Sequence, residues 1–368
     1  MINNTKIKIY FVGIGGIGMS GIAELMHEIG YTVLGSDKIE SENVKRLKKI
    51  GIKVKIGHDK KNLNKVNAVV FSSAISQNNP EIQEAKKKHI PIVSRADMLS
   101  ELMKNKKCIA IAGSHGKTTT TSLVGNILES GKLDPTIVNG GIINSLSKNN
   151  KFGKGKWMVV EADESDGSFL KLPHEISIIT NLDIEHLDYY KTPKKLYSSF
   201  EKFIMNLPFY GTSIVNEDDV NLKKIIQKND TRRIITFSIK NKKSNVFVDK
   251  IYFDKQYSYF TLNYNFLDDK LSKSYSYKLR AGGLHNVYNG AASIIVGHLV
   301  GVKNFFIKDA LKNYIGVKRR FTYLGKINLA YIYDDYAHHP TEIAATLLGA
   351  KQIHKKIIVV FQPHRYSR

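Results

Sequence analysis

Twice in this chain a short apolar run ends in a cluster of glycines, and each time a helical pattern follows. The first run, KIKIYFV, precedes Gly-Ile-Gly-Gly-Ile-Gly at 13–18, and the second, CIAIA, precedes Gly-Ser-His-Gly-Lys-Thr-Thr at 113–119. Around these loops, short apolar runs keep alternating with helical stretches, which predicts βαβ units and parallel sheets. The sequence therefore predicts an α/β fold whose ligands bind at loops that follow strands.

The 368 residues are enough for two to three domains, and the pattern along the chain divides it into three parts. The pattern in residues 1–105 predicts one α/β domain, and the pattern in 106–316 predicts a second. Within the second, the alternation of aromatic and polar residues at 234–280 predicts an antiparallel insert. Residues 317–368 predict a strand (AYIYDDY), a helix and a second strand (KIIVVFQPHRYSR). We expect this part either to pack on the second domain or to be a truncated domain, because it is too small to be stable alone.

Composition excludes several classes of protein. The N-terminus has no cleavable leader and no run approaches the 18 or so apolar residues of a membrane span, so we expect a cytoplasmic protein without a membrane partner. A single cysteine, Cys108, excludes an internal disulfide and a thiolate metal cluster. The net charge is +23, but only nine basic residues are arginines and the lysines are scattered. Since no base-reading motif is present, we expect no specific nucleic-acid partner.

The first glycine loop has the spacing Gly-x-Gly-x-x-Gly, and Asp37 ends the next predicted strand. Such a loop lets the backbone approach a phosphate, and the acidic residue is placed to bind a ribose hydroxyl. By itself the motif fits NAD, FAD or a nucleotide-sugar, or a tight turn without a ligand. The candidate residues are Gly13, Gly15, Gly16, Gly18 and Asp37.

The second glycine loop predicts a triphosphate site. Its backbone N–H groups would surround phosphate oxygens, Lys117 would reach the outer phosphates, and Thr118 would bind Mg²⁺. Ile111 stands where the strict Gly-x-x-x-x-Gly-Lys-[Ser/Thr] pattern has its first glycine, so the match is partial. The candidate residues are Gly113, Ser114, His115, Gly116, Lys117, Thr118 and Thr119.

Two further loops follow apolar strands and carry acidic or imidazole groups. The first contains four carboxylates, at Glu161, Asp163, Glu164 and Asp166. They would repel one another unless a cation offsets them, so we interpret the loop as a Mg²⁺ site or as a solvated acidic turn. His186 lies in the second loop, NLDIEHLD, and is either a metal ligand or a structural hydrogen-bonding group.

Polar residues in the last third of the chain complete the candidate set. Asn286 and Asn289 share one face of a predicted helix, where they either bind an adenine edge or cap the helix. Four of the nine arginines lie in RRF at 319–321 and in QPHRYSR at 362–368. Since they occupy loops after predicted strands, they either bind an anionic or carboxylate ligand or form an ordinary basic surface.

Together these motifs resemble the Mur ligase family. The resemblance runs through the chain in order, in GIGGIGMSGIAE, GSD, SSAI, SRADMLSEL, AGSHGKTTTT, EADESDGSFL, TNLDIEHLD, HNVYNGAA, RRFTYLG, DDYAHHPTEI and FQPHRYSR. DDYAHHP and FQPHRYSR are similar to the member that adds alanine. The resemblance implies an N-terminal Rossmann-like parallel sheet for a UDP-sugar, a central P-loop ATPase-type α/β domain with the antiparallel insert, and an incomplete C-terminal Rossmann-like domain for the amino acid.

The resemblance also implies a reaction in peptidoglycan precursor synthesis. ATP, with Mg²⁺, would phosphorylate the lactyl carboxylate of UDP-N-acetylmuramate, and the amine of L-alanine would then attack the acyl phosphate. In this scheme Lys117, His186, Arg320 and His338 are catalytic, and Thr118, Glu161 and His186 bind metal. ATP would contact the second loop, Asn286, Asn289, Arg320 and Asp335. The substrates would contact the first loop, Asp37, His58, Ser72, Ser73, Tyr336, His338, His364, Arg365 and Arg368.

Two alternatives compete with this ligase. An NAD-dependent oxidoreductase would account for the first glycine loop but leaves the second unexplained. A nucleotide-sugar-binding remnant, catalytically impaired because part of the C-terminal domain is missing, would bind UDP-N-acetylmuramate without turnover. The sequence makes no prediction of oligomeric state.

Overall fold

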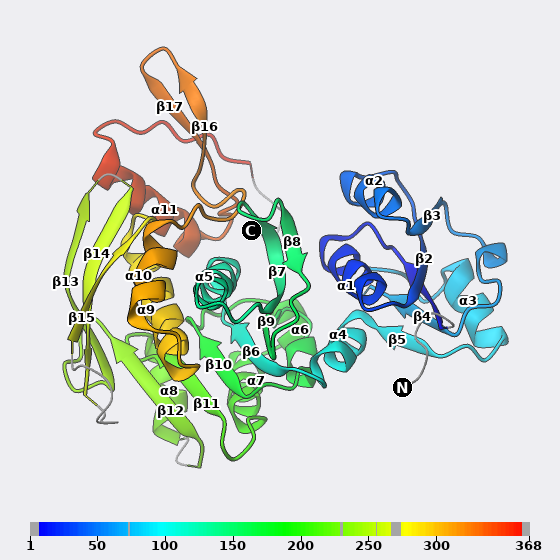
Figure 1. The fold of residues 1–368 in the computed structure, drawn as a ribbon, viewed down its shortest axis with the longest axis horizontal. Coiled ribbons are helices and arrows are strands. Elements are labelled where there is room, and N and C mark those ends of the chain that lie inside the picture. The colour runs from blue at the N-terminus through cyan, green and yellow to red at the C-terminus, as the bar shows by residue number, and fades with distance from the viewer. Residues whose placement is uncertain (1–6, 73, 229–230, 255, 266–273, 363–368) are drawn as a thin grey trace.

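The chain forms a five-stranded sheet, a ten-stranded sheet and a two-stranded hairpin, in that order along the sequence (Figure 1). The computed structural model describes residues 7–72, 74–228, 231–254, 256–265 and 274–362. Its α/β architecture confirms the fold class predicted from the alternating pattern. Among the described residues, no helix is both long and apolar enough to span a bilayer.

The first sheet is parallel and has the strand order β3-β2-β1-β4-β5. Residues of β1 alternate between its two faces: Phe11 packs with the core beneath α1, whereas Tyr10 packs toward Ile82 of α3. The elements are β1 (Lys8–Val12), α1 (Ile17–Glu28), β2 (Thr32–Asp37), α2 (Glu42–Lys49), β3 (Lys53–Ile56), the 3-10 turn η2 (Lys60–Asn62), β4 (Ala68–Phe71), α3 (Pro80–Lys87), β5 (Ile92–Ser94) and α4 (Arg95–Met103).

The second sheet has the order β15-β14-β13-β12-β11-β10-β6-β9-β7-β8. The strands of this sheet and the helices between them are, in chain order, β6 (Lys107–Ala112), α5 (Lys117–Ser130), β7 (Thr136–Ile143), β8 (Lys148–Lys151), β9 (Trp157–Glu161), the 3-10 turn η3 (Ser168–Lys171), β10 (Ile176–Ile179), α6 (Leu187–Tyr190), α7 (Pro193–Met205), β11 (Thr212–Asn216), α8 (Val220–Lys228), β12 (Arg233–Ser238), β13 (Val246–Asp254), β14 (Tyr257–Tyr264) and β15 (Ser274–Leu279), followed by α9 (Leu284–Leu299) and α10 (Asn304–Lys312).

Helices cover both faces of this second sheet. Along β6, Ile109 and Ile111 pack toward α5 and α9, while Ala110 packs into the cluster that includes Phe200 and Phe203 of α7. A strand buried on both faces reads as a continuous apolar run rather than an alternating one. This explains why CIAIA and WMVV carry no period-2 signal. The loops after β6, β9 and β10 therefore meet at one edge of a buried sheet.

The antiparallel insert expected at 234–280 is only partly correct. Strands β13, β14 and β15 pair antiparallel, but β12 pairs parallel with β11, and β13 pairs parallel with β12. The antiparallel strands thus extend the parallel sheet instead of forming a separate unit. The reason is that Ile235 and Phe237 of β12 belong to the same buried cluster as β10 and β11, so the sheet continues without a break.

The last part of the chain contains a hairpin and one helix. Strands β16 (Thr322–Ile327) and β17 (Ala330–Asp334) form an antiparallel hairpin that projects from the rest of the molecule, and α11 (Pro340–Ile353) packs against α9 (Figure 1). The second strand predicted here is wrong over 357–362, which lie in irregular structure with Ile358 and Val360 exposed. An apolar run becomes a strand only beside a hydrogen-bonding partner, and 357–362 pair with none of the described strands.

Candidate functional site

The second glycine loop connects β6 to α5 and is shaped by two glycines with positive φ. Gly113 has φ +131° and Gly116 has φ +82°, a region that favours glycine. A Cβ on Gly113 would collide with Thr180 Oγ1, and one on Gly116 would lie 2.6 Å from Asn289 Oδ1. The loop therefore passes closely between the loop after β10 and helix α9, and it leads directly into the N-terminus of α5.

Lys117 lies at the start of α5 and is held over the loop. Its Nζ lies 2.9 Å from Glu164 Oε1, and it donates to the backbone carbonyls of Gly113 and Ser114. Burial lowers the pKa of Lys117, but the nearby carboxylates of Glu164 and Glu161 outweigh this and raise it above its ordinary value. Lys117 is thus a buried cation placed beside the loop amides.

The acidic loop after β9 faces this helix end rather than solvent. Glu161 accepts a hydrogen bond from Thr118 Oγ1 at 3.1 Å and another from the Gly140 N–H at 2.7 Å, and Glu164 is 2% exposed. The interpretation as a solvated acidic turn is therefore wrong for these two residues. A hydroxyl and a carboxylate oxygen lie side by side here, which is a donor set that suits Mg²⁺.

His186 approaches the same group from the loop after β10. It has φ +55°, and its Nε2 lies 3.7 Å from Glu164 Oε1 and 3.7 Å from Glu185 Oε2. The imidazole is thus surrounded by carboxylates next to Lys117. This arrangement fits both interpretations of His186, as a metal ligand and as a hydrogen-bonding group.

A cavity of about 310 Å³ joins these groups to the C-terminal part of the chain. Residues from the end of β9, from the loops after β6, β9 and β10, and from the start of α5 line it together with residues of the last segment, 317–368. The predicted site residues around it are Ser114, His115, Lys117, Glu161, His186, Arg320, Tyr336 and His338. Groups spread over more than half of the sequence are thus brought to one cavity.

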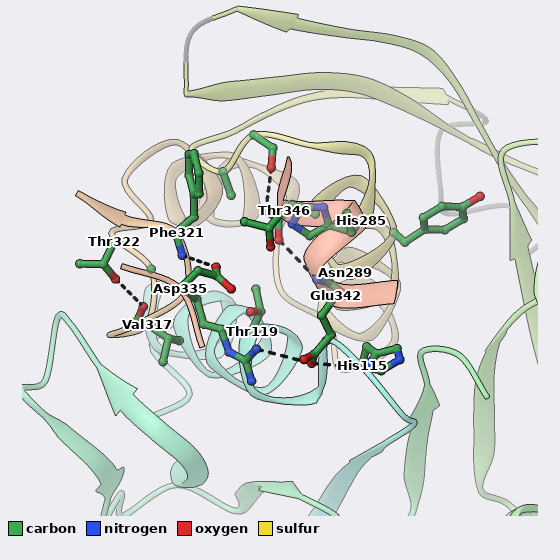
Figure 2. Close-up of a pocket in the computed structure, with 18 of the residues that line it drawn as sticks. His115, Thr119, His285, Asn289, Val317, Phe321, Thr322, Asp335, Glu342 and Thr346 are labelled. Atoms are coloured by element: carbon green, nitrogen blue, oxygen red, sulfur yellow. Dashed lines mark hydrogen bonds and ion pairs between the residues drawn. The ribbon is translucent and has the colours of Figure 1, made fainter. Parts of the chain in front are cut away.

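A larger cavity, of about 1120 Å³, lies next to the loop and is lined by α9, the β16–β17 hairpin and α11 (Figure 2). Asn286 and Asn289 line it from one helix face, with Asn289 Nδ2 3.3 Å from Asn286 Oδ1. The alternative that they cap the helix is wrong, because Gly283 occupies the N-cap of α9 without any side-chain cap. His285, also in the lining, is neutral because burial lowers its pKa to about 4.

Asp335 and Thr119 line the larger cavity as well (Figure 2). Asp335 accepts hydrogen bonds from the backbone N–H groups of Phe321 and Ala337, each at 2.7 Å. Burial raises the pKa of Asp335 above its ordinary value, although these two hydrogen bonds act in the opposite direction. Its carboxylate thus fixes the loops on both sides of the hairpin while facing the cavity.

The first glycine loop lies apart from both cavities, in the N-terminal sheet. Gly13, at φ +76°, follows β1, and Gly15 donates its N–H to Asp37 Oδ2 at 2.7 Å. Gly16 is the N-cap of α1, and Gly18 lies against the guanidinium of Arg95. Asp37 therefore holds the loop itself in shape, a role that the prediction of a ribose contact did not include.

The remaining predicted substrate residues are divided between this domain and the end of the chain. His58 Nδ1 lies 2.9 Å from Glu81 Oε2 and 2.9 Å from Ser36 Oγ, in a buried polar group. Ser72 follows β4 and accepts a hydrogen bond from the N–H of Ala74. Ser73, His364, Arg365 and Arg368 lie outside the described residues.

Sequence reasoning missed the residues that connect the second glycine loop to the last segment. His115 lies 2.8 Å from Asp183, 3.1 Å from Glu185 and 3.3 Å from Glu342, and its ring stacks on that of His339. Glu342 was not among the candidates. The available signal was its position three residues after His339, which is the spacing of a capping box and places it at a helix start.

Family models match almost the whole chain: "Mur ligase family, catalytic domain" over 8–107, "Mur ligase middle domain" over 111–297, and "Mur ligase, glutamate ligase domain" over 319–367. A UDP-N-acetylmuramate–L-alanine ligase of Agrobacterium fabrum is 47% identical over 364 residues, which are 98% of this chain and 77% of that protein.

Solved structures agree with this. The crystal structure of a UDP-N-acetylmuramate-alanine ligase from Thermotoga maritima has a TM-score of 0.85 and 32% identity, covering 98% of this chain and 81% of that one. A murein peptide ligase from Psychrobacter arcticus has a TM-score of 0.80 and 26% identity, covering 94% of this chain and 76% of that one.

Proposed function

The chain belongs to the Mur ligase family, and on that premise we propose that it is an ATP-dependent ligase that joins L-alanine to the lactyl carboxylate of UDP-N-acetylmuramate. Relatives with that activity in their names match 98% or more of this chain at 47% identity. Peptidoglycan precursor synthesis is the corresponding process, with roles in cell shape and division, and we propose the cytoplasm as its location.

The observation that carries this proposal is the 310 Å³ cavity, where Lys117 and His186 of the central domain face Arg320 and His338 of the last segment. Joining a carboxylate to an amine requires a good leaving group, which phosphorylation of the carboxylate supplies. The protein's part is to position the reactants and to neutralise the charge that moves between them. A cavity that holds a cation and an imidazole on each of two facing sides suits both tasks.

In this proposal Lys117 contacts the outer phosphates of ATP and Arg320 neutralises charge on the transferred group. Asn286 and Asn289 contact adenine and Asp335 the ribose, in the larger cavity. Thr118 and Glu161 hold one Mg²⁺ and His186 a second. The hydrogen bond between Thr118 and Glu161 supports the first metal assignment, because it shows that the two oxygens lie close enough together to bind the same ion. Bound Mg²⁺ would supply charge stabilisation of the phosphates.

We propose the following division of the chain: 1–105 binds the UDP-sugar, 106–316 binds ATP, and 317–368 binds the amino acid. The first glycine loop (Gly13, Gly15, Gly16 and Gly18) would contact the nucleotide together with Asp37, His58, Ser72 and Ser73. Tyr336, His338, His364, Arg365 and Arg368 would surround alanine and the new amide.

The two alternatives have less support. An oxidoreductase leaves the second loop, the Thr118–Glu161 pair and the cavity around Lys117 without a role. The comparisons give no support to a non-catalytic remnant, since the relatives at 47% identity are named as ligases.

Substitution Lys117→Ala tests the proposal. We expect it to abolish alanine-dependent phosphate release, because the buried cation beside the loop is lost. Lys104→Ala, which removes an exposed lysine paired with Glu101, is the matched control and is expected to keep full activity. Calorimetric binding of UDP-N-acetylmuramate shows whether the variant is folded. Undiminished turnover in folded Lys117→Ala would refute the proposed function.

A further inference from the structure

Glu342 lies in the first turn of α11 and uses its two carboxylate oxygens for different tasks. Oε2 accepts from the backbone N–H of the N-cap residue His339 at 3.4 Å, which is the capping-box contact, and from that of His338 at 3.2 Å. Capping needs no more than this oxygen. Oε1 is directed away from its own helix, toward the phosphate loop, so helix capping alone does not account for the side chain.

Oε1 contacts two side chains of the proposed nucleotide site. It lies 3.3 Å from His115 Nδ1 and 3.8 Å from Arg320 Nη1, and Figure 2 shows Glu342 and His115 facing each other. The Glu342 side chain is 12% exposed, so the contact is shielded from solvent. Oε2 in turn lies 3.4 Å from His338 Nδ1. One carboxylate therefore contacts the phosphate loop, the predicted phosphate-binding arginine and the predicted catalytic histidine.

The His115 side of this contact is positively charged. Its Nε2 faces Asp183 Oδ2 at 2.8 Å, while its Nδ1 faces Glu342. An ionised carboxylate only accepts hydrogen bonds, so both ring nitrogens must carry a proton. Although burial lowers it, hydrogen bonds to Asp183 and Glu342 raise the pKa of His115 to about 9. His115 is thus an imidazolium that bridges carboxylates of the central domain and of α11.

We propose that Glu342 is a positioning residue: it ties α11 to the phosphate loop through His115 and thereby sets Arg320 and His338 over the reacting phosphate. The proposal rests on the ligase function above and adds to it a residue that touches no reactant. Its physical basis is charge. His115, Lys117 and Arg320 converge on one small cavity. Asp183 and Glu185 also face His115, and Glu164 faces Lys117, but Glu342 Oε1 is the carboxylate oxygen that lies between His115 and Arg320 and so offsets the repulsion between these two cations from different parts of the chain.

Glu342→Gln separates the charge from the capping role, since glutamine is also accepted at this position of a capping box. We expect kcat to fall by about 10²-fold, the size of effect seen when reacting groups are slightly misplaced. The KM for UDP-N-acetylmuramate is expected to be unchanged, because its proposed site lies in the N-terminal domain. Glu101→Gln, at an exposed pair in α4, is the control and should leave both constants unchanged.

Hydrogen exchange provides a readout that does not depend on turnover. With Mg²⁺ and a non-hydrolysable ATP analogue, we expect protection of the backbone amides of 338, 339 and 341–345 in the wild type and loss of that protection in Glu342→Gln. His115→Asn should have the same effect, and the double variant should be no worse than either single one. If the wild type lacks alanine-dependent turnover, the ligase function fails while this measurement still decides the role of Glu342.

Three results would overturn the role of Glu342. The first is wild-type kcat in Glu342→Gln. The second is a loss that Glu342→Gln and His115→Asn produce additively, which would mean that the two act separately. The third is faster exchange along the whole of α11 without nucleotide, which would make Glu342 a structural cap only.

Discussion

At the scale of single residues, the site is organised by charges that face each other across the fold. His115 is in contact with Asp183, Glu185 and Glu342, and its ring stacks on His339. The sequence placed His115 in the glycine loop between a strand and a helix, where the structure has it, because that motif is local. Its carboxylate partners come from the loop after β10 and from the first turn of α11, and no spacing rule connects them to it.

This environment predicts a pH dependence of stability. The pKa of His115 is raised from 6.5 to about 9 in the folded protein, so its contribution to stability is complete below pH 6.5 and is lost as the pH rises through 9. We expect His115→Asn to lower the thermal unfolding midpoint more at pH 6.5 than at pH 9.5. Circular dichroism melts of both proteins at the two pH values measure this.

His174 is the matched control for this prediction. Burial lowers its pKa, which is the opposite direction to His115. The loss of unfolding midpoint caused by His174→Asn should therefore be no larger at pH 6.5 than at pH 9.5. A pH-independent effect of His115→Asn would show that its imidazole is not charged in the folded state.

At the scale of elements, helix α5 begins where a left-handed glycine allows the loop to approach α9. Gly116 and Gly51 both have positive φ, at +82° and +94°, but a Cβ on Gly116 would lie 2.6 Å from Asn289 whereas one on Gly51 would contact nothing within 4 Å. Each alanine substitution should lower the free energy of unfolding by about 1–2 kcal/mol through backbone strain.

Of these two substitutions, only Gly116→Ala should also weaken the binding of the nucleotide. Because it displaces the amides at the start of α5, we expect the Kd for an ATP analogue to rise by about tenfold or more, equal to at least about 1.4 kcal/mol. Isothermal calorimetry on both variants measures this. Equal ATP affinity in Gly116→Ala and Gly51→Ala would contradict a phosphate site at this helix start.

At the scale of the whole molecule, the N-terminal domain is connected to the central domain beside its glycine loop. Asn149 of β8 donates from Nδ2 to the carbonyl of Ile17, the first residue of α1, at 3.0 Å. Nearby, Lys148 lies 3.7 Å from the buried carboxylate of Glu24. The central sheet therefore holds the loop that we propose binds the UDP-sugar.

Substitution Asn149→Ala should loosen that loop. Losing one hydrogen bond costs about 0.5–1.5 kcal/mol, so we expect the Kd for UDP-N-acetylmuramate to rise by up to about tenfold while ATP affinity stays unchanged. Asn126→Ala is the control, because Asn126 Nδ2 donates to the carbonyl of Ala310 within the central domain. The prediction fails if calorimetry finds the same affinity for UDP-N-acetylmuramate in both variants.

Several features of this protein follow from its sequence alone. The alternation of apolar runs and helices, and the glycines that end two of those runs, predict the parallel sheets and the loop around Lys117. The reason is that a strand, its loop and the following helix are specified by residues within a few positions of one another. The shared helix face of Asn286 and Asn289 was predictable for the same reason.

Only the tertiary structure decided which strands pair and which side chains from distant parts of the chain come into contact. It extended the parallel sheet through β12 and left 357–362 without a strand, because pairing depends on which backbone lies alongside. It also brought Glu342 to His115, two residues far apart in the chain whose contact stabilises neither local element. Local physics sets strands, turns and helix caps, whereas charges from distant loops come together only after the chain has packed.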